Sequence, residues 1–105
     1  MPNVVVRYRT KPERAEENQR LVEEVFADLR ERGASGFSYT CLRLEDGVSF
    51  VHIVVEDDEG PGENLTDVPA FQRFVADIGD RCDEQPVALR ATVVGAHRSG
   101  EHARP

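Results

Sequence analysis

The chain has 105 residues, of which 39 % are hydrophobic and 31 % charged, as in one ordinary globular domain and unlike a disordered segment. The formal net charge is −7, and the sequence has no basic stripe that could neutralise a nucleic acid backbone. No apolar run approaches the roughly 20 residues that cross a bilayer. We therefore expect one domain in residues 1–97, a flexible tail in 98–105, a cytoplasmic location, and neither nucleic acid nor membrane as a partner.

Residues 3–9 alternate in hydrophobicity with a period of two and are rich in valine, which predicts a first strand. Thr10 and Glu13 have the spacing of a capping box, and Pro12 fits the first turn of a helix. Apolar residues then recur at helical spacing up to Leu29, and Gly33 is suited to the left-handed position that ends a helix.

A hairpin is predicted next. Residues 36–44 and 48–56 both alternate with a period of two, and Asp46-Gly47 between them favours a two-residue type I′ turn. Counting back from that turn pairs Cys41 with His52, Tyr39 with Val54, and Phe37 with Glu56. All six side chains should then lie on one face of the sheet.

The remainder of the chain predicts one more helix and one more strand. The stretch from Asp57 to Asp67 is acidic and rich in glycine, so we expect an exposed loop, with a lid as the alternative. A second helix should begin near Pro69 and continue past Cys82, because apolar residues repeat at three and four residue intervals. Pro86 should end it, and residues 87–96 should form a fourth strand.

The order βαββαβ predicts an α+β, ferredoxin-like domain, in which two helices cover one face of a four-stranded antiparallel sheet. We expect the aliphatic set Val51, Ile53 and Val55 to face the helices, and Phe50, His52 and Val54 to face the other way. Because both faces of the hairpin are apolar, the face without helices needs a cover. A second copy of the chain, in a homodimer, is the simplest one.

Several segments resemble the antibiotic biosynthesis monooxygenase family. They are Arg7 to Pro12 before the acidic helix, Gly36-Phe37-Ser38-Tyr39, Phe50 to Asp57, and Leu65 to Phe74. The resemblance implies a dimeric α+β barrel whose two sheets enclose a cavity, and oxidation of aromatic molecules by oxygen without metal or flavin. Many members carry a tryptophan where this chain has Glu56, and the chain contains no tryptophan.

Two criteria give opposite orientations for Arg7 and Arg9. The alternation of the first strand turns Val4, Val6 and Tyr8 toward the helices and the two arginines away from them. Alignment to the family suggests the reverse.

The strongest candidates for chemistry are His52 and Tyr39, because imidazole can take a proton from a phenol or enol and a tyrosine hydroxyl can orient a ligand. Neighbouring residues on the same face would bind the substrate: Phe37, Cys41, Phe50, Val54 and Glu56. The alternative interpretation of Cys41 and His52 is a small buried thiol beside a core histidine. His52 and Glu56 would lie about 13 Å apart on one strand, too far to share a metal ion.

We therefore predict a cofactor-independent monooxygenase acting on an aromatic or enolic molecule. The alternatives are a dimer that binds a small apolar ligand without catalysis or has a regulatory role, and a haem-binding or haem-degrading relative. We expect no cofactor. Cys41 and Cys82 have no zinc or redox spacing and should be free thiols on opposite sides of the sheet.

Overall fold

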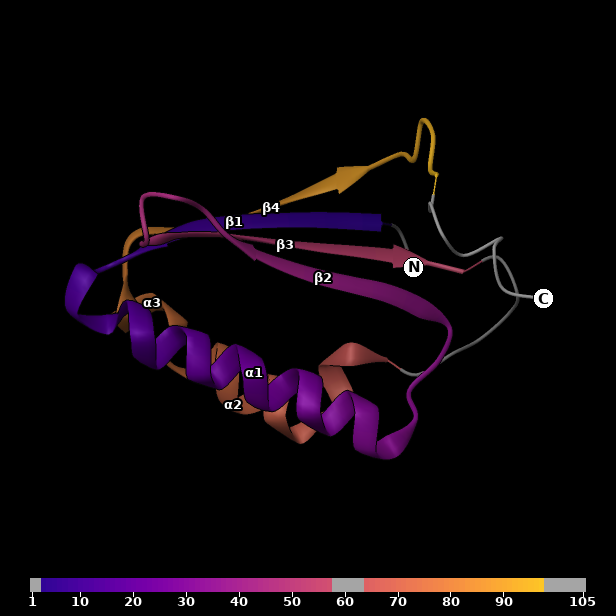
Figure 1. The fold of residues 1–105 in the computed structure, drawn as a ribbon, viewed down its shortest axis with the longest axis horizontal. Helices are drawn as coiled ribbons and strands as arrows, with labels where there is room; N and C mark the ends of the chain where they lie inside the picture. Colours follow the sequence, from indigo (N-terminus) through magenta and orange to yellow (C-terminus); the bar gives the residue numbers. More distant parts are fainter. Residues whose placement is uncertain (1–2, 58–63, 98–105) are drawn as a thin grey trace.

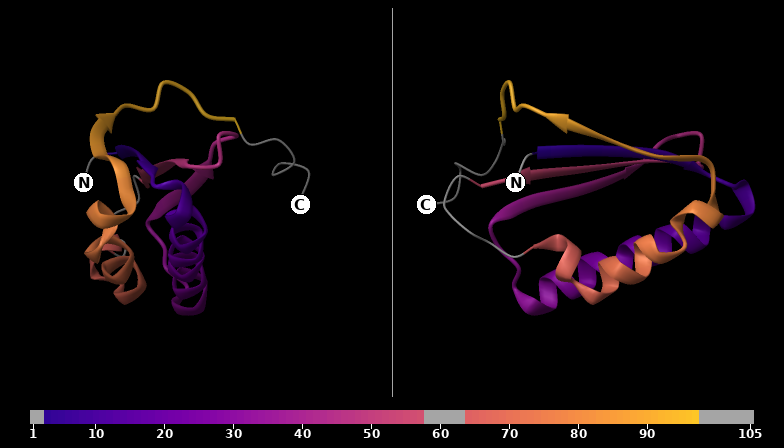
Figure 2. Two further views of the ribbon diagram at one scale, coloured as in Figure 1. Left: turned by 90° about the vertical axis from the view of Figure 1, so that its left-hand side faces the viewer. Right: turned by 180° about the vertical axis from the view of Figure 1, so that it is seen from behind.

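A computed structural model describes residues 3–57 and 64–97. Its elements are β1 (Asn3–Thr10), a 3-10 turn (Pro12–Arg14), α1 (Ala15–Arg32), β2 (Phe37–Arg43), β3 (Ser49–Glu56), a second 3-10 turn (Leu65–Asp67), α2 (Pro69–Ala76), α3 (Ile78–Arg81) and β4 (Cys82–Ala91). The strands form one antiparallel sheet in the order β2-β3-β1-β4, and the helices lie on one side of it (Figures 1 and 2). The predicted α+β, ferredoxin-like fold is confirmed.

The first helix starts differently from the prediction. Thr10 does not cap α1, because its hydroxyl donates to the Val48 carbonyl at 3.2 Å, and the 3-10 turn beginning at Pro12 leads into the helix instead. The predicted helix end is confirmed, since Gly33 has a φ of 62° and its N–H bonds to the carbonyls of the last turn. α1 buries the stripe Ala15, Asn18, Val22 and Val25.

The register of the β2–β3 hairpin is the predicted one, with Cys41 opposite His52 and Tyr39 opposite Val54. The turn is different. Only Gly47 has positive φ, at 80°, whereas a type I′ turn would require it at Asp46 as well. The Asp46 carboxylate instead accepts the backbone N–H groups of Val48 and Ser49 at 2.9 and 2.8 Å, which stabilises a wider loop of unchanged register.

The prediction for the last two elements was wrong in its boundaries. α2 ends at Ala76, the single turn of α3 follows, and Cys82 begins β4 instead of continuing the helix. Pro86 lies within β4 and does not end a helix. A proline is tolerated there because β4 is an edge strand, and the pairing with β1 is irregular nearby.

The facing of β3 is the reverse of the prediction. Phe50 and His52 face the helices, are 1 % and 4 % exposed, and lie in the same layer as Tyr8 of β1. Val51 and Ile53 are on the other face, since they pair with Arg7 and Val5. The polar His52 can be buried because partners on β1 and β2 satisfy both ring nitrogens.

The sheet has one face without helices (Figure 2), and exposed aliphatic side chains lie on that face. Leu42, Val87 and Leu89 are 46 %, 45 % and 50 % exposed there. Arg7 and Arg9 are also turned to this side, as the alternation of β1 predicted, and Arg9 forms an exposed ion pair of 3.0 Å with Glu84. The expected flexible tail in 98–105 and most of the expected loop from Asp57 to Asp67 lie outside the described residues. Within residues 3–57 and 64–97 no helix is long and apolar enough to cross a membrane.

Candidate functional site

A small cavity lies between the sheet and α2. Its volume is about 160 Å³, and it is lined by Val6, Tyr8, Tyr39, His52, Val54, Leu65, Phe71, Phe74, Val75, Ile78 and Pro86. We call it the sheet–α2 cavity. Its polar side chains are the two tyrosines and the histidine, and every other lining side chain is apolar. A dry apolar cavity of about 150 Å³ holds one benzene molecule, so this one has room for a single ring.

His52 stands between two tyrosine hydroxyls that come from different strands. The Tyr8 hydroxyl of β1 lies 2.7 Å from its Nε2 atom, and the Tyr39 hydroxyl of β2 lies 2.7 Å from its Nδ1 atom. The Cys41 thiol is 3.5 Å from Nε2. The alternation of the strands places these four side chains on one face, and together they engage both imidazole nitrogens.

Burial determines the charge state of these groups. Desolvation lowers the pKa of His52 to about 4, because the charged imidazolium would lose its hydration. Desolvation likewise raises the pKa of Cys41 to about 11 and raises the pKa values of Tyr8 and Tyr39 well above their ordinary range. All four side chains are therefore uncharged near neutral pH, which suits an uncharged ligand.

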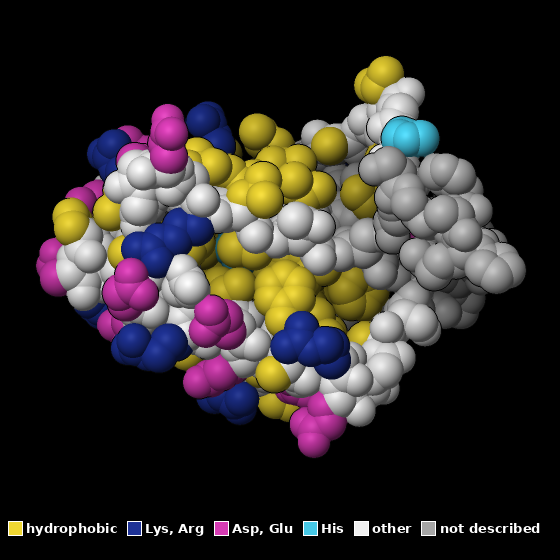
Figure 3. All heavy atoms as spheres, in the orientation of Figure 1, with side chains coloured by type: hydrophobic (Ala, Val, Ile, Leu, Met, Phe, Trp, Pro, Cys, Tyr) yellow, Lys and Arg dark blue, Asp and Glu magenta, His cyan; other side chains and the backbone are white. Residues whose placement is uncertain are grey.

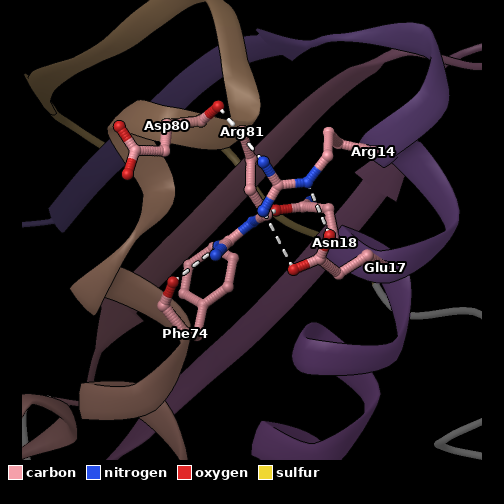
Figure 4. Close-up of polar contacts among 6 residues, drawn as sticks. All are labelled: Arg14, Glu17, Asn18, Phe74, Asp80 and Arg81. Atoms are coloured by element: carbon pink, nitrogen blue, oxygen red, sulfur yellow. Dashed lines mark hydrogen bonds and ion pairs between the residues drawn. The ribbon is translucent and has the colours of Figure 1, made fainter.

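Two more buried polar residues extend this network away from the cavity. The Asn18 side-chain amide of α1 donates to the Tyr8 hydroxyl at 2.9 Å, and its Oδ1 accepts from Arg81 Nε at 3.0 Å. Arg81 is 1 % exposed, and its guanidinium also donates to the Phe74 carbonyl at 2.6 Å (Figure 4). The guanidinium carbon lies 5.3 Å from the centre of the Phe74 ring, so α1, α2 and α3 are tied together at this point.

The structure distributes the predicted site residues over several places. Tyr39, His52 and Val54 line the sheet–α2 cavity. Cys41 and Phe50 line a separate hollow next to α1, and Phe37 lies with Tyr39 at the C-terminal end of α1. Glu56 ends β3 opposite Phe37. Figure 3 shows apolar side chains exposed between the sheet and the charged side chains of the helix layer.

Sequence reasoning missed Tyr8, Asn18 and Arg81 as members of the site. Asn18 carried a signal, because it lies three residues after Ala15 and four before Val22, within the apolar stripe of α1. A polar residue on a buried stripe needs a buried polar partner. Arg81 had no such signal, because no pattern distinguishes it from the other arginines of the chain.

Comparison with known proteins supports the fold. No protein-family model matches the chain, and no curated protein matches it. A solved structure of an antibiotic biosynthesis monooxygenase is 19 % identical, covers 90 % of this chain and 100 % of its own, and has a TM-score of 0.66. The chain has the fold of the antibiotic biosynthesis monooxygenases.

Two further structures show how widely this monooxygenase fold is used. Rv0793 from Mycobacterium tuberculosis is 15 % identical over 91 % of this chain and 97 % of its own, with a TM-score of 0.69. A Nitrosomonas europaea protein of unknown function is 14 % identical over 91 % of each chain, with a TM-score of 0.67. At these identities the likeness establishes the fold, and the chemistry has to be argued from the cavity.

Proposed function

We propose that the sheet–α2 cavity binds a small, uncharged aromatic or enolic molecule and that the protein is a cofactor-independent monooxygenase. The observation that carries this proposal is the pair of Tyr39 and His52, placed in an otherwise apolar cavity and uncharged near neutral pH. Such a cavity favours a flat apolar ligand.

The cavity volume restricts the ligand class. About 160 Å³ accommodates one ring and not a polycyclic aromatic molecule or haem. Both ring nitrogens of His52 are hydrogen-bonded, so neither is available as an iron ligand without breaking a bond to a tyrosine. These two features disfavour the haem-binding alternative.

The proposed reaction oxidises an activated CH₂ group next to an enol or phenol. One oxygen atom of O₂ enters the substrate as a carbonyl and the other leaves as water, with all four electrons supplied by the substrate. The sequence-based hypothesis gave His52 direct contact with the ligand as a base. Because both of its nitrogens are engaged, we propose that Tyr39 contacts the ligand oxygen and that His52 positions Tyr39.

A ligand-binding protein without catalysis is the second candidate. It is favoured by the burial of His52, since desolvation lowers the pKa of the imidazole to about 4 and makes it a weak base at neutral pH. The protein would then bind its ligand without consuming oxygen. The predicted substrate contacts of Phe37, Cys41, Phe50 and Glu56 would likewise be structural.

We further propose that two copies associate through the aliphatic face of the sheet. Leu42, Val87 and Leu89 form part of an apolar surface that a monomer would leave in water. A homodimer would cover it with the same surface of a second copy, and the two sheets would pack face to face.

Ligand titration followed by oxygen uptake tests the function. Single-ring phenols such as 4-methylphenol, which are uncharged at neutral pH, should bind and perturb the NMR signals of residues lining the cavity. Val54→Phe should fill the cavity and abolish binding, whereas Ala27→Phe, on the exposed side of α1, should not. Oxygen consumption with any of these ligands supports the monooxygenase, binding without consumption supports the second candidate, and no binding at all refutes both.

A further inference from the structure

A further hollow lies on the face of the sheet without helices. Its volume is about 230 Å³, and its aliphatic walls are Leu44, Val51 and Val87. The pairing of β1 with β4 is irregular at this place. Arg7 is opposite Val87, whereas Arg9 is opposite Glu84, so β4 contains one extra residue there. Such a bulge bends a strand and re-aims its side chains. We call this space the open-face hollow.

Arg7 is the charged side chain of the open-face hollow that lacks a partner. Within residues 3–57 and 64–97 its guanidinium has neither a hydrogen bond nor an ion pair. Glu84 also lines the hollow, but its carboxylate lies 3.0 Å from the guanidinium of Arg9, which balances its charge. The hollow therefore carries a net positive charge, which favours an anionic ligand.

The other polar side chains of the open-face hollow have their hydrogen-bond donors engaged elsewhere. The Ser49 hydroxyl donates to a carboxylate oxygen of the hairpin loop at 2.6 Å, and the Gln85 amide donates to two backbone carbonyls at 3.0 and 3.5 Å. The Tyr8 hydroxyl lies 2.7 Å from His52 in the buried network. Among the described lining residues, the available side-chain donors are therefore those of Arg7. Their planar arrangement matches the two oxygens of a carboxylate.

The proposed dimer makes a partner for Arg7 necessary. Val51 and Val87 are its cross-strand neighbours, and Val87 belongs to the apolar surface that a second copy would cover. A guanidinium enclosed there without a counter-ion is strongly unfavourable, because it loses its hydration. A bound anion would remove that cost.

We infer that the open-face hollow binds the ionised form of a small carboxylic acid with an apolar body, that its carboxylate pairs with Arg7, and that the bound acid strengthens the proposed dimer. The aliphatic walls contact the apolar body, and the single negative charge matches the single unpaired guanidinium. The carboxylate site is independent of the proposed function of the sheet–α2 cavity. Its effect on association rests on the proposed dimer.

Three probes separate the contribution of charge from that of shape. 4-Methylbenzoate has both a carboxylate and an apolar ring, 4-methylbenzamide has nearly the same shape without the charge, and acetate has the charge without the ring. In calorimetric titrations at low salt, 4-methylbenzoate should bind roughly 10-fold more tightly than either of the others. Equal affinities for 4-methylbenzoate and 4-methylbenzamide would overturn the inference.

Three variants locate the binding site. Arg7→Gln should lower the affinity for 4-methylbenzoate to that for 4-methylbenzamide, whereas Arg20→Gln, the same change at an exposed position of α1, should leave it unchanged. Equal losses in these two variants would show a non-specific effect of charge and overturn the inference. Val54→Phe fills the sheet–α2 cavity and should not affect this affinity. Loss of binding in Val54→Phe would place the acid in that cavity and likewise overturn the inference.

Light scattering over a dilution series tests the effect on association. Saturating 4-methylbenzoate should lower the concentration at which the natural dimer dissociates by roughly 3- to 10-fold, and it should have no such effect on Arg7→Gln. A dimer that is unchanged or weakened by the acid refutes this link. A monomer that binds the acid through Arg7 refutes the proposed dimer while the carboxylate site stands. A dimer that binds no 4-methylbenzoate refutes the carboxylate site while the dimer stands.

Discussion

The Tyr39 hydroxyl and His52 Nδ1 lie 2.7 Å apart although the two residues are not paired across the hairpin. Tyr39 is opposite Val54, and His52 is opposite Cys41, so the contact is a diagonal one that a long aromatic side chain can make. Tyr39 is held from its other side by stacking on Phe26 of α1, with ring centres 4.7 Å apart. The hydroxyl is thus positioned by one neighbouring strand and one helix.

The two tyrosines should differ in their effect on stability. Tyr8→Phe leaves the buried side-chain N–H of Asn18 without its acceptor and His52 Nε2 without its short hydrogen bond, and should lower the free energy of unfolding by about 2–4 kcal/mol. Tyr39→Phe removes a single bond at a half-buried site and should cost about 1 kcal/mol. Urea denaturation measures both. Equal losses would contradict the bridging role of Tyr8.

Stability should also decrease in acid because of His52. Its folded pKa of about 4 lies below the ordinary value of 6.5, so the unfolded chain binds a proton first as the pH falls. Its contribution is fully present above pH 6.5 and is lost between pH 6.5 and about 4, amounting to about 3 kcal/mol. His52→Gln should flatten the curve of unfolding free energy against pH within that window. A slope equal to that of the natural protein would show that carboxylates alone account for it.

The sequence was sufficient to predict the register of the β2–β3 hairpin and the side chains that share one of its faces. The alternation with a period of two and the position of the glycine turn determine both. It was insufficient for which face the helices cover. The aliphatic residues Val51, Ile53 and Val55 were expected to face the helices. His52 faces the helices instead, since the hydroxyls of Tyr8 and Tyr39 hydrogen-bond to both of its ring nitrogens. The hydrogen bond from Tyr8 requires β1 to lie beside β3, in the strand order β2-β3-β1-β4. No local sequence pattern contains this relation between distant segments. The start of β4 was missed because Cys82 continued the apolar spacing of the helix before it.

The thiols should remain free and should react slowly in the folded protein. Cys41 and Cys82 are on the same side of the sheet, contrary to the sequence-based expectation, but on its two edge strands. Three strand spacings separate them by about 14 Å, far beyond disulfide reach. Burial raises the pKa of Cys41 to about 11 and raises the pKa of Cys82 as well. Mass spectrometry after alkylation without reductant should find two modified thiols in denaturant and few under native conditions; a linked pair would refute this arrangement.

The proposed dimer can be tested by introducing one charge on the aliphatic face. Leu89 is 50 % exposed and pairs with Val5, which places it among the apolar side chains that a second copy would cover. Leu89→Lys would bury an unpaired ammonium in that interface, at a cost of several kcal/mol, and should convert the dimer to monomer at micromolar concentration. Ala27→Lys adds the same charge on the exposed side of α1 and should leave the dimer intact. Light scattering of the natural protein and both variants decides the question, because a natural protein that is already monomeric, or a Leu89→Lys variant that stays dimeric, would refute this interface.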